Sequence, residues 1–292
     1  MTQQKIPVIF GEVLFDCFSD DQCILGGAPF NVAWHLQAFQ HQPCFITRVG
    51  EDELGAEIVN SMEQWGMDTK QVQRDKEHVT GRVNVIVENN EPSYDIAENS
   101  AYDFIDSSKI NLPNSAAILY HGSLALRNKV SRQAYESLIN HHELPIFMDV
   151  NLRSPHWQSE EVLNWVDKAR WVKLNYDELL QLGAGTGNQE KDMAVFQEKH
   201  AIKELIVTRG EAGAIVRTEN GKLYSAKPPQ VTHLVDTVGA GDAFTSVYIH
   251  GILSDWPVIR TLELAQEFAS AVVAQQGATT TDPKFYLPFN MA

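Results

Sequence analysis

Residues 236–242, Asp-Thr-Val-Gly-Ala-Gly-Asp, combine small residues with a carboxylate where a helix is expected to begin. The run at residues 243–253 is largely apolar and long enough for a buried helix. Gly239, Ala240 and Gly241 then lie at its N-terminus, where unpaired N–H groups attract anions. Asp242, in the first turn, is placed to accept a proton from a hydroxyl. These parts indicate phosphoryl transfer, although the same pattern also suits an ordinary strand-to-helix turn.

A second group of small and polar residues lies near the N-terminus. Residues 26–33, Gly-Gly-Ala-Pro-Phe-Asn-Val-Ala, precede an amphipathic run at residues 32–39. The Asn31 amide donates and accepts hydrogen bonds, and the Asp16 carboxylate accepts them, which is the chemistry that polyol recognition requires. Asn31 would also serve simply as the N-cap of the helix that follows.

Both segments resemble motifs of the ribokinase-like (PfkB) family of carbohydrate kinases. Further similarity is found at residues 50–55 (Gly-x-Asp-x-x-Gly), 175–178 (Asn-x-x-Glu) and 208–213 (Thr-x-Gly-x-x-Gly), so the resemblance covers nearly the whole chain. Residues 11–16 and 149–153 are most similar to the fructokinase branch, followed by the 2-keto-3-deoxygluconate kinases. The chain departs from the family at Gln40, where glycine is usual, and at Val247, where alanine or glycine is usual. Neither position is expected to touch the reacting groups, so these departures affect only the expected local packing and the assignment to a subgroup of the family.

The resemblance implies a role for each candidate residue. Asp242 is expected to be the general base, and the N–H groups of Gly239, Ala240 and Gly241 to stabilise the transferring phosphoryl group. The expected sugar-binding residues are Asp16, Gly26, Gly27 and Asn31. Arg153 is a candidate for binding a phosphate or a sugar carboxylate; the alternative is a surface arginine beside Trp157.

The nucleotide side is expected at Asn175, Thr208, Gly210 and Gly213, with ATP as the phosphate donor. Glu178 is the candidate ligand of Mg²⁺, which prefers oxygen ligands and usually keeps several waters. Asn175 and Glu178 also match a helix cap with its capping box, and both descriptions can hold together. The Thr-Arg-Gly segment is also an ordinary turn. Some relatives bind a monovalent cation such as K⁺ near the Gly-Ala-Gly-Asp turn, and the resemblance leaves this open here.

Composition excludes several partners. The chain has 292 residues, with 23 Lys and Arg against 38 Asp and Glu, for a formal charge of −15. This charge disfavours nucleic acid and anionic membranes, and no apolar stretch long enough to span a membrane occurs. We therefore expect a cytoplasmic protein. Cys17, Cys23 and Cys44 lack metal-site spacing and are expected to be reduced thiols.

The elements that hold these residues are expected to form an α/β fold, a doubly wound and mainly parallel sheet. Strand-like runs at residues 8–10, 45–49, 117–120, 146–150, 171–174 and 205–208 alternate with helix-length segments. A hairpin is expected in residues 81–104. With residues 12–25, it is predicted to form a small β lid on a single domain of residues 1–292. Ligands bind beyond the carboxyl ends of such strands, where Asp149, Asn175 and Thr208 fall.

The sequence thus predicts an ATP- and Mg²⁺-dependent sugar kinase, with fructose as the first acceptor to consider and a homodimer among the possible assemblies. The alternatives within the family are kinases of 2-keto-3-deoxygluconate, ribose or a nucleoside. From another class, a sugar- or nucleotide-binding protein without turnover is the rival. A Rossmann dehydrogenase is disfavoured because no Gly-x-Gly-x-x-Gly follows the first strand.

Overall fold

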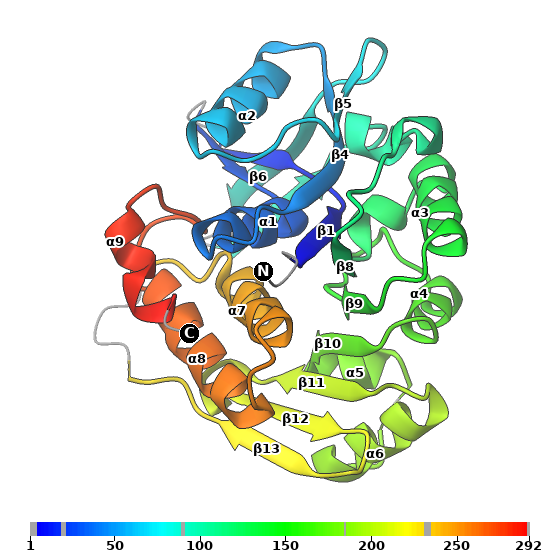
Figure 1. Ribbon diagram of the computed structural model, residues 1–292, viewed down its shortest axis with the longest axis vertical. Coiled ribbons are helices and arrows are strands. Elements are labelled where there is room, and N and C mark those ends of the chain that lie inside the picture. Colours follow the sequence, from blue (N-terminus) through cyan, green and yellow to red (C-terminus); the bar gives the residue numbers. More distant parts are fainter. Residues whose placement is uncertain (1–4, 19–21, 89–90, 184, 231–234, 291–292) are drawn as a thin grey trace.

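A large, mainly parallel sheet runs through the computed structural model, which describes residues 5–18, 22–88, 91–183, 185–230 and 235–290 (Figure 1). Its strands are β1 (Ile6–Phe10), β4 (Cys44–Gly50), β5 (Val72–Asp75), β8 (Ala116–His121), β9 (Ile146–Asp149), β10 (Trp171–Asn175), β11 (Glu204–Thr208), β12 (Ala214–Thr218) and β13 (Leu223–Ala226). The strand order is β13-β12-β11-β10-β9-β8-β1-β4-β5. Neighbours from β5 to β11 pair in parallel, whereas β12 and β13 add an antiparallel edge.

All six predicted core strands are present as β1, β4, β8, β9, β10 and β11. They are apolar because both faces of a parallel sheet are covered. The predicted doubly wound arrangement is therefore confirmed. The edge strands β5, β12 and β13 were not predicted, because each has at most three consecutive apolar residues and its polar residues weaken the signal.

Helices cover both faces of the sheet, with a separate apolar cluster under each set. One face carries α1 (Ala28–Ala38), α2 (Glu53–Gln64), α7 (Ala240–Leu253) and α8 (Val258–Val272), and the other α3 (Lys129–His141), α4 (Ser159–Val166), α5 (Tyr176–Gln181) and α6 (Gln189–Lys199). Shorter helical segments are η1 (Ala101–Phe104), η2 (Ser107–Lys109), η3 (Leu124–Leu126), η4 (Gly210–Ala212), α9 (Pro283–Tyr286) and η5 (Leu287–Phe289). None of the helices in the described part of the chain has the length and apolar character needed to cross a membrane.

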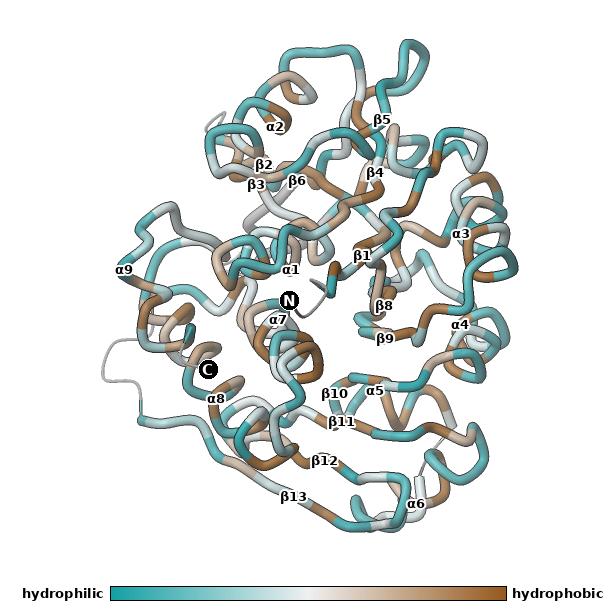
Figure 2. Tube along the Cα trace, in the orientation of Figure 1, coloured by the Kyte–Doolittle hydropathy of each residue, from teal (hydrophilic) through white to brown (hydrophobic). Residues whose placement is uncertain are grey.

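The helix α7 is largely enclosed. Ten of its 14 residues are buried, and Figure 2 colours much of it as hydrophobic. It packs between α1 and α8. Such enclosure fixes the position of the helix N-terminus, where Asp242 lies.

A small separate sheet lies beside the large one. Its strands are β2 (Leu14–Phe18), β3 (Cys23–Gly26), β6 (Gly81–Glu88) and β7 (Glu91–Ile96), in the order β3-β2-β6-β7. The antiparallel pair β6 and β7 is the hairpin predicted within residues 81–104. Of the predicted lid segments, residues 19–21 and 89–90 lie outside the described residues.

The small sheet corrects the expectation that all three cysteines are reduced thiols. Cys17 and Cys23 form a disulfide, whereas Cys44 is free. The reason is strand pairing: β2 and β3 are antiparallel with Cys17 directly opposite Cys23, and their Cα atoms are 4.1 Å apart. Cross-strand neighbours of this kind are close enough to be bridged, which a separation of six residues in the sequence does not reveal.

Candidate active site

A cavity of about 710 Å³ lies between the two sheets, beyond the carboxyl ends of the parallel strands. Glu12 follows β1, Asp149 ends β9 and Lys173 is the middle residue of β10; all three line this cavity. Leu25, from β3 of the small sheet, lines it as well. The location matches the general rule for ligand binding in open α/β sheets.

Asp242 and Asn31 meet in this cavity although 211 residues separate them. The Asn31 Nδ2 group donates a 2.8 Å hydrogen bond to Asp242 Oδ2. Asn31 lies inside α1, whose N-cap is Gly27, so the alternative that Asn31 merely caps that helix is wrong. The Asn31 Oδ1 atom is buried and has no hydrogen-bond partner among the described residues. It is therefore available to accept a hydrogen bond from a ligand hydroxyl.

The N-terminus of α7 has the geometry of an anion site. Its first bonded turn begins with the Ala243 N–H group, which donates to the Gly239 carbonyl. The N–H groups of Gly241 and Asp242 precede that bond and point out of the helix end. Gly239 is in the left-handed region at φ 80°, and a Cβ atom there would lie 2.3 Å from the Ala278 Cβ atom. This turn therefore requires glycine.

Burial raises the pKa of the Asp242 carboxyl above its ordinary value. The hydrogen bond from Asn31 opposes this rise, the negative charge of Asp149 adds to it, and the positive charges of Lys173 and Arg153 reduce it. A carboxylate with a raised pKa is a stronger base than an ordinary aspartate. Asp242 is thus suited to accept a proton from an alcohol.

Carboxyl groups dominate the end of the cavity nearest the small sheet. Burial raises the pKa of Glu12 to about 7 and that of Asp16 to about 6. Arg153 opposes both shifts, and Asp242 increases both. The exposed Arg153 side chain therefore faces these acids, and its charge acts on the cavity. The Glu12 Oε2 atom is buried without a partner among the described residues.

Eight of the residues predicted from the sequence line this one cavity: Asp16, Gly26, Gly27, Asn31, Arg153, Gly239, Gly241 and Asp242. Ala240 lies between two of them in the first turn of α7. Gly27 has φ 106°, and a Cβ atom there would be 3.0 Å from the Glu12 carbonyl oxygen, so the backbone itself requires this glycine. Gly26 shows no such constraint.

The residues predicted for the nucleotide lie outside the lining of the cavity, at the ends of two neighbouring strands. Asn175 and Thr208 are register partners at the ends of β10 and β11. Gly210 and Gly213 both have positive φ, and a Cβ atom on Gly213 would lie 2.1 Å from the Ala226 carbonyl oxygen. Gly213 thus has a structural reason to be glycine, and its role toward a nucleotide stays a prediction.

Asn175 and Glu178 form a reciprocal capping box at the start of α5. Glu178 Oε2 accepts from the Asn175 N–H group at 2.8 Å, and Oε1 accepts from the Leu152 N–H group at 2.7 Å. Both carboxylate oxygens keep free lone pairs, so Glu178 fits a hydrated Mg²⁺ through water better than direct contact. No cluster of three or more His, Cys, Asp or Glu side chains suited to a metal occurs among the described residues. A single carboxylate, that of Glu178, fits an ion that is held mainly by phosphates and water.

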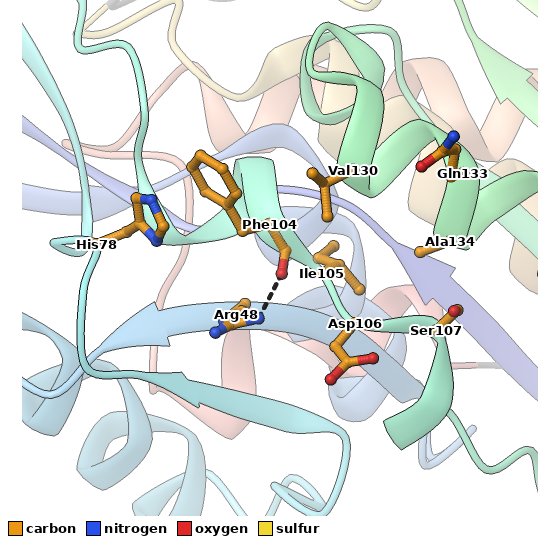
Figure 3. Close-up of a pocket in the computed structure, with 9 residues that line it drawn as sticks. All are labelled: Arg48, His78, Phe104, Ile105, Asp106, Ser107, Val130, Gln133 and Ala134. Carbon is orange, nitrogen blue, oxygen red and sulfur yellow. Dashed lines mark hydrogen bonds between the residues drawn. The ribbon is translucent and has the colours of Figure 1, made fainter.

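A second cavity, of about 270 Å³, lies between η1 and the start of α3 (Figure 3). Arg48 lines it and donates to the Phe104 carbonyl oxygen at 2.6 Å. Arg48 also pairs with the buried Asp75 at 2.8 Å, and His78 stacks on the Phe104 ring. Arg48 and His78 thus already have partners within the protein, and none of the predicted site residues lies here. We assign the active site to the larger cavity.

Sequence reasoning gave no role to Glu12 and Lys173, which line the larger cavity, or to Thr245, which contacts Asp149. Lys173 pairs with Asp149 at 2.7 Å, and Thr245 Oγ1 lies 2.9 Å from the same Asp149 oxygen. The available signal was a lysine within the otherwise apolar strand Trp-Val-Lys-Leu. Charged residues are rarely buried in such strands unless they are paired.

Comparisons with known proteins agree with this geometry. The model of the pfkB family of carbohydrate kinases matches residues 16–284. The chain is 29% identical to probable fructokinase-5 of Arabidopsis thaliana over 99% of its own length and 95% of that protein. It is 27% identical to 5-dehydro-2-deoxygluconokinase of Clostridium beijerinckii, over 89% of this chain and 81% of that one.

A solved structure shares the whole architecture. The structure of fructokinase from Vibrio cholerae O395, in its fructose, ADP and calcium ion bound form, aligns with a TM-score of 0.83 and 25% identity. The alignment covers 97% of this chain and 98% of that one. Since the family model spans most of the sequence and the fold agrees over its full length, this chain belongs to the PfkB family of carbohydrate kinases.

Proposed function

We propose that the protein transfers the γ-phosphate of ATP to a hydroxyl group of a neutral monosaccharide, with fructose as the preferred acceptor. The observation that carries this proposal is the Asn31–Asp242 hydrogen bond at the N-terminus of α7, inside a cavity large enough for a sugar. A base and a row of outward N–H groups then lie side by side. These are the two groups that phosphoryl transfer to an alcohol needs.

In the proposed reaction, the sugar oxygen attacks the γ-phosphorus of ATP. Its proton passes to Asp242, whose raised pKa favours acceptance. The bond between the γ-phosphorus and the bridging oxygen breaks, and its electron pair remains on ADP. The N–H groups of Gly239 and Gly241, with that of Asp242, stabilise the charge on the transferring group without reorganising, whereas the Ala240 N–H group donates to the Thr237 carbonyl oxygen at 3.4 Å.

The charges of the cavity support a neutral sugar over a sugar acid. Five carboxyl groups line the cavity, Glu12, Asp16, Asp149, Asp236 and Asp242, against two cations among the described lining residues, Arg153 and Lys173. Lys173 is already paired with Asp149. Apart from Asp16, the side chains by which the small sheet lines the cavity are apolar, such as Val83. An additional sugar carboxylate would be repelled there. The rival acceptors are ribose, nucleosides and 2-keto-3-deoxygluconate. In the last case Arg153 would hold the carboxylate of the sugar acid.

The nucleotide is proposed to bind along the ends of β10 and β11, with Asn175, Thr208, Gly210 and Gly213 beside its phosphates and ribose. When bound, Mg²⁺ neutralises part of the phosphate charge. Glu178 would hold it through water, since its oxygens already accept two backbone N–H groups. A monovalent cation such as K⁺ near the turn that precedes α7 is proposed as a further ligand.

The small sheet is proposed to act as a lid on a single domain of residues 1–292. Its residues Leu25 and Ile96 face the cavity, so closure would exclude water and favour transfer to the sugar over hydrolysis. Phe18 and Ile24 of the same sheet remain more than a third exposed. Contact between two such surfaces would form the proposed homodimer, which light scattering would detect as twice the monomer mass.

The test is an ADP-release assay with fructose, ribose, 2-keto-3-deoxygluconate and nucleosides as acceptors. We expect turnover with fructose and a kcat lowered by about 10²- to 10⁴-fold in Asp242→Asn, with sugar binding retained. A nearly fully active Asp242→Asn variant would remove Asp242 from the role of base. If no acceptor yields product even in a single turnover, the protein is a ligand-binding member of the fold and not an enzyme.

A further inference from the structure

A buried ion pair lies directly beneath the proposed phosphoryl site. Asp149 and Lys173 are opposite each other in the parallel register of β9 and β10, so their side chains point to the same face of the sheet. Asp149 is 1% exposed and Lys173 is 6% exposed. The Lys173 Nζ group donates to Asp149 Oδ2 at 2.7 Å. Both side chains line the active-site cavity together with Asp242.

Stability alone does not account for this pair. Removing two charges from water costs about as much as their attraction returns, and apolar side chains of similar size are often at least as stabilising. The neighbouring residues of β10, Val172 and Leu174, are fully buried and apolar. A lysine at this position therefore indicates a task other than packing.

The position of the ammonium group identifies that task. The Nζ atom lies 3.5 Å from where a Cβ atom on Gly241 would be, next to the first turn of α7. A cation beside a helix N-terminus is unfavourable, because both are positive. An anion bound between them removes this conflict and receives donors from both. Within the described residues the Lys173 ammonium donates a hydrogen bond to Asp149, and an ammonium group has three N–H donors, which leaves donors for such an anion.

Thr245 connects the pair to α7. Its Oγ1 atom lies 2.9 Å from Asp149 Oδ2 and 2.9 Å from the Gly241 carbonyl oxygen, one turn earlier in the same helix. This hydroxyl holds the first turn of α7 over the ion pair. The distance from the ammonium to the helix N-terminus is thus fixed before a ligand arrives.

We infer that Lys173 is a further catalytic residue, whose ammonium group contacts a non-bridging oxygen of the transferring phosphoryl group, and that Asp149 is its positioning residue. The inference rests on the proposed kinase function. In the step, the sugar oxygen forms a bond to the γ-phosphorus, the bond to the ADP oxygen breaks and the alcohol proton goes to Asp242. Lys173 keeps its proton throughout. It stabilises the charge that spreads over the phosphoryl oxygens.

The test compares Lys173→Met with the double variant Asp149→Asn/Lys173→Met. The single variant leaves a buried carboxylate unpaired and is expected to lose stability, whereas the double variant removes both charges and is expected to recover it. For both, kcat should fall by about 10²- to 10³-fold while KM for the sugar stays within about threefold. Lys173→Arg, which keeps a cation, should be more active than Lys173→Met.

Arg48→Met is the matched control, because Arg48, which lines the second cavity (Figure 3), forms an ion pair with the buried Asp75. Its thermal midpoint should fall while kcat per folded molecule stays within about twofold of the wild type. If the double variant regains both stability and kcat, Lys173 has only a structural role and the inference is overturned. A wild-type protein that phosphorylates no acceptor overturns the proposed function and this inference together, so the two failures are distinguishable.

Discussion

Replacing Glu12 by glutamine should stabilise the protein at alkaline pH. Burial raises the pKa of this carboxyl from 4.5 to about 7, and the side chain is only 3% exposed. Between these pH values the unfolded chain releases a proton that the folded chain keeps. The free energy of unfolding therefore falls as pH rises through this window. Above about pH 7 the folded protein carries the full destabilisation that comes from ionising buried Glu12. At 1.36 kcal/mol per pKa unit, the rise in the pKa of Glu12 corresponds to about 3 kcal/mol of lost stability.

Urea denaturation followed by tryptophan fluorescence measures the effect at about pH 5 and about pH 8. Glu12→Gln should exceed the wild type by about 3 kcal/mol at the higher pH and by about 1 kcal/mol or less at the lower one. Glu57→Gln, at an exposed position of α2, is the matched control and should change stability by less than about 0.5 kcal/mol at both. An advantage of Glu12→Gln that is equal at both pH values would refute the reasoning, because Glu12 would then titrate alike in the folded and unfolded chains.

Three further predictions concern the reaction. Asn31→Leu removes the hydrogen bond that lowers the pKa of Asp242, so the acidic limb of the kcat profile should move to higher pH; an unmoved limb contradicts this. Gly239→Ala should lower kcat about 100-fold through the clash with Ala278, whereas Gly187→Ala, with the same φ of 80° and open space, should not. Chelation of divalent metal should abolish ADP release and added Mg²⁺ should restore it; activity that persists under chelation would remove the metal from the reaction.

The arrangement of the large sheet was predictable from the sequence because parallel strands are buried on both faces. Their apolar runs stand out from the polar segments around them, and each predicted run coincides with a strand. The base and the anion site were predictable for another reason. Gly239 and Asp242 belong to a contiguous segment, and its backbone demands are visible in the residue types.

The remaining parts depend on contacts that no local pattern encodes. The Cys17–Cys23 disulfide follows from the antiparallel register of β2 and β3. The environment of Glu12 follows from burial against a separate sheet. The pairing of Lys173 requires β9 and β10 to be neighbours, which depends on strand order and not on either strand alone. In each case the partner is supplied by tertiary structure.

The meeting of Asn31 and Asp242 shows how the fold creates reactivity. In the large sheet, the chain leaves β1 toward β4 on one side, and β8 lies on the other, so the strand order reverses between them. This reversal opens a crevice at the carboxyl ends, where ligands bind in such sheets. The helix α7 packs against α1 beside it, and this packing brings the amide within 2.8 Å of the carboxylate. Because both helices are buried, the amide cannot follow a displaced carboxylate, and the base is held in a position suited to a single attacking oxygen.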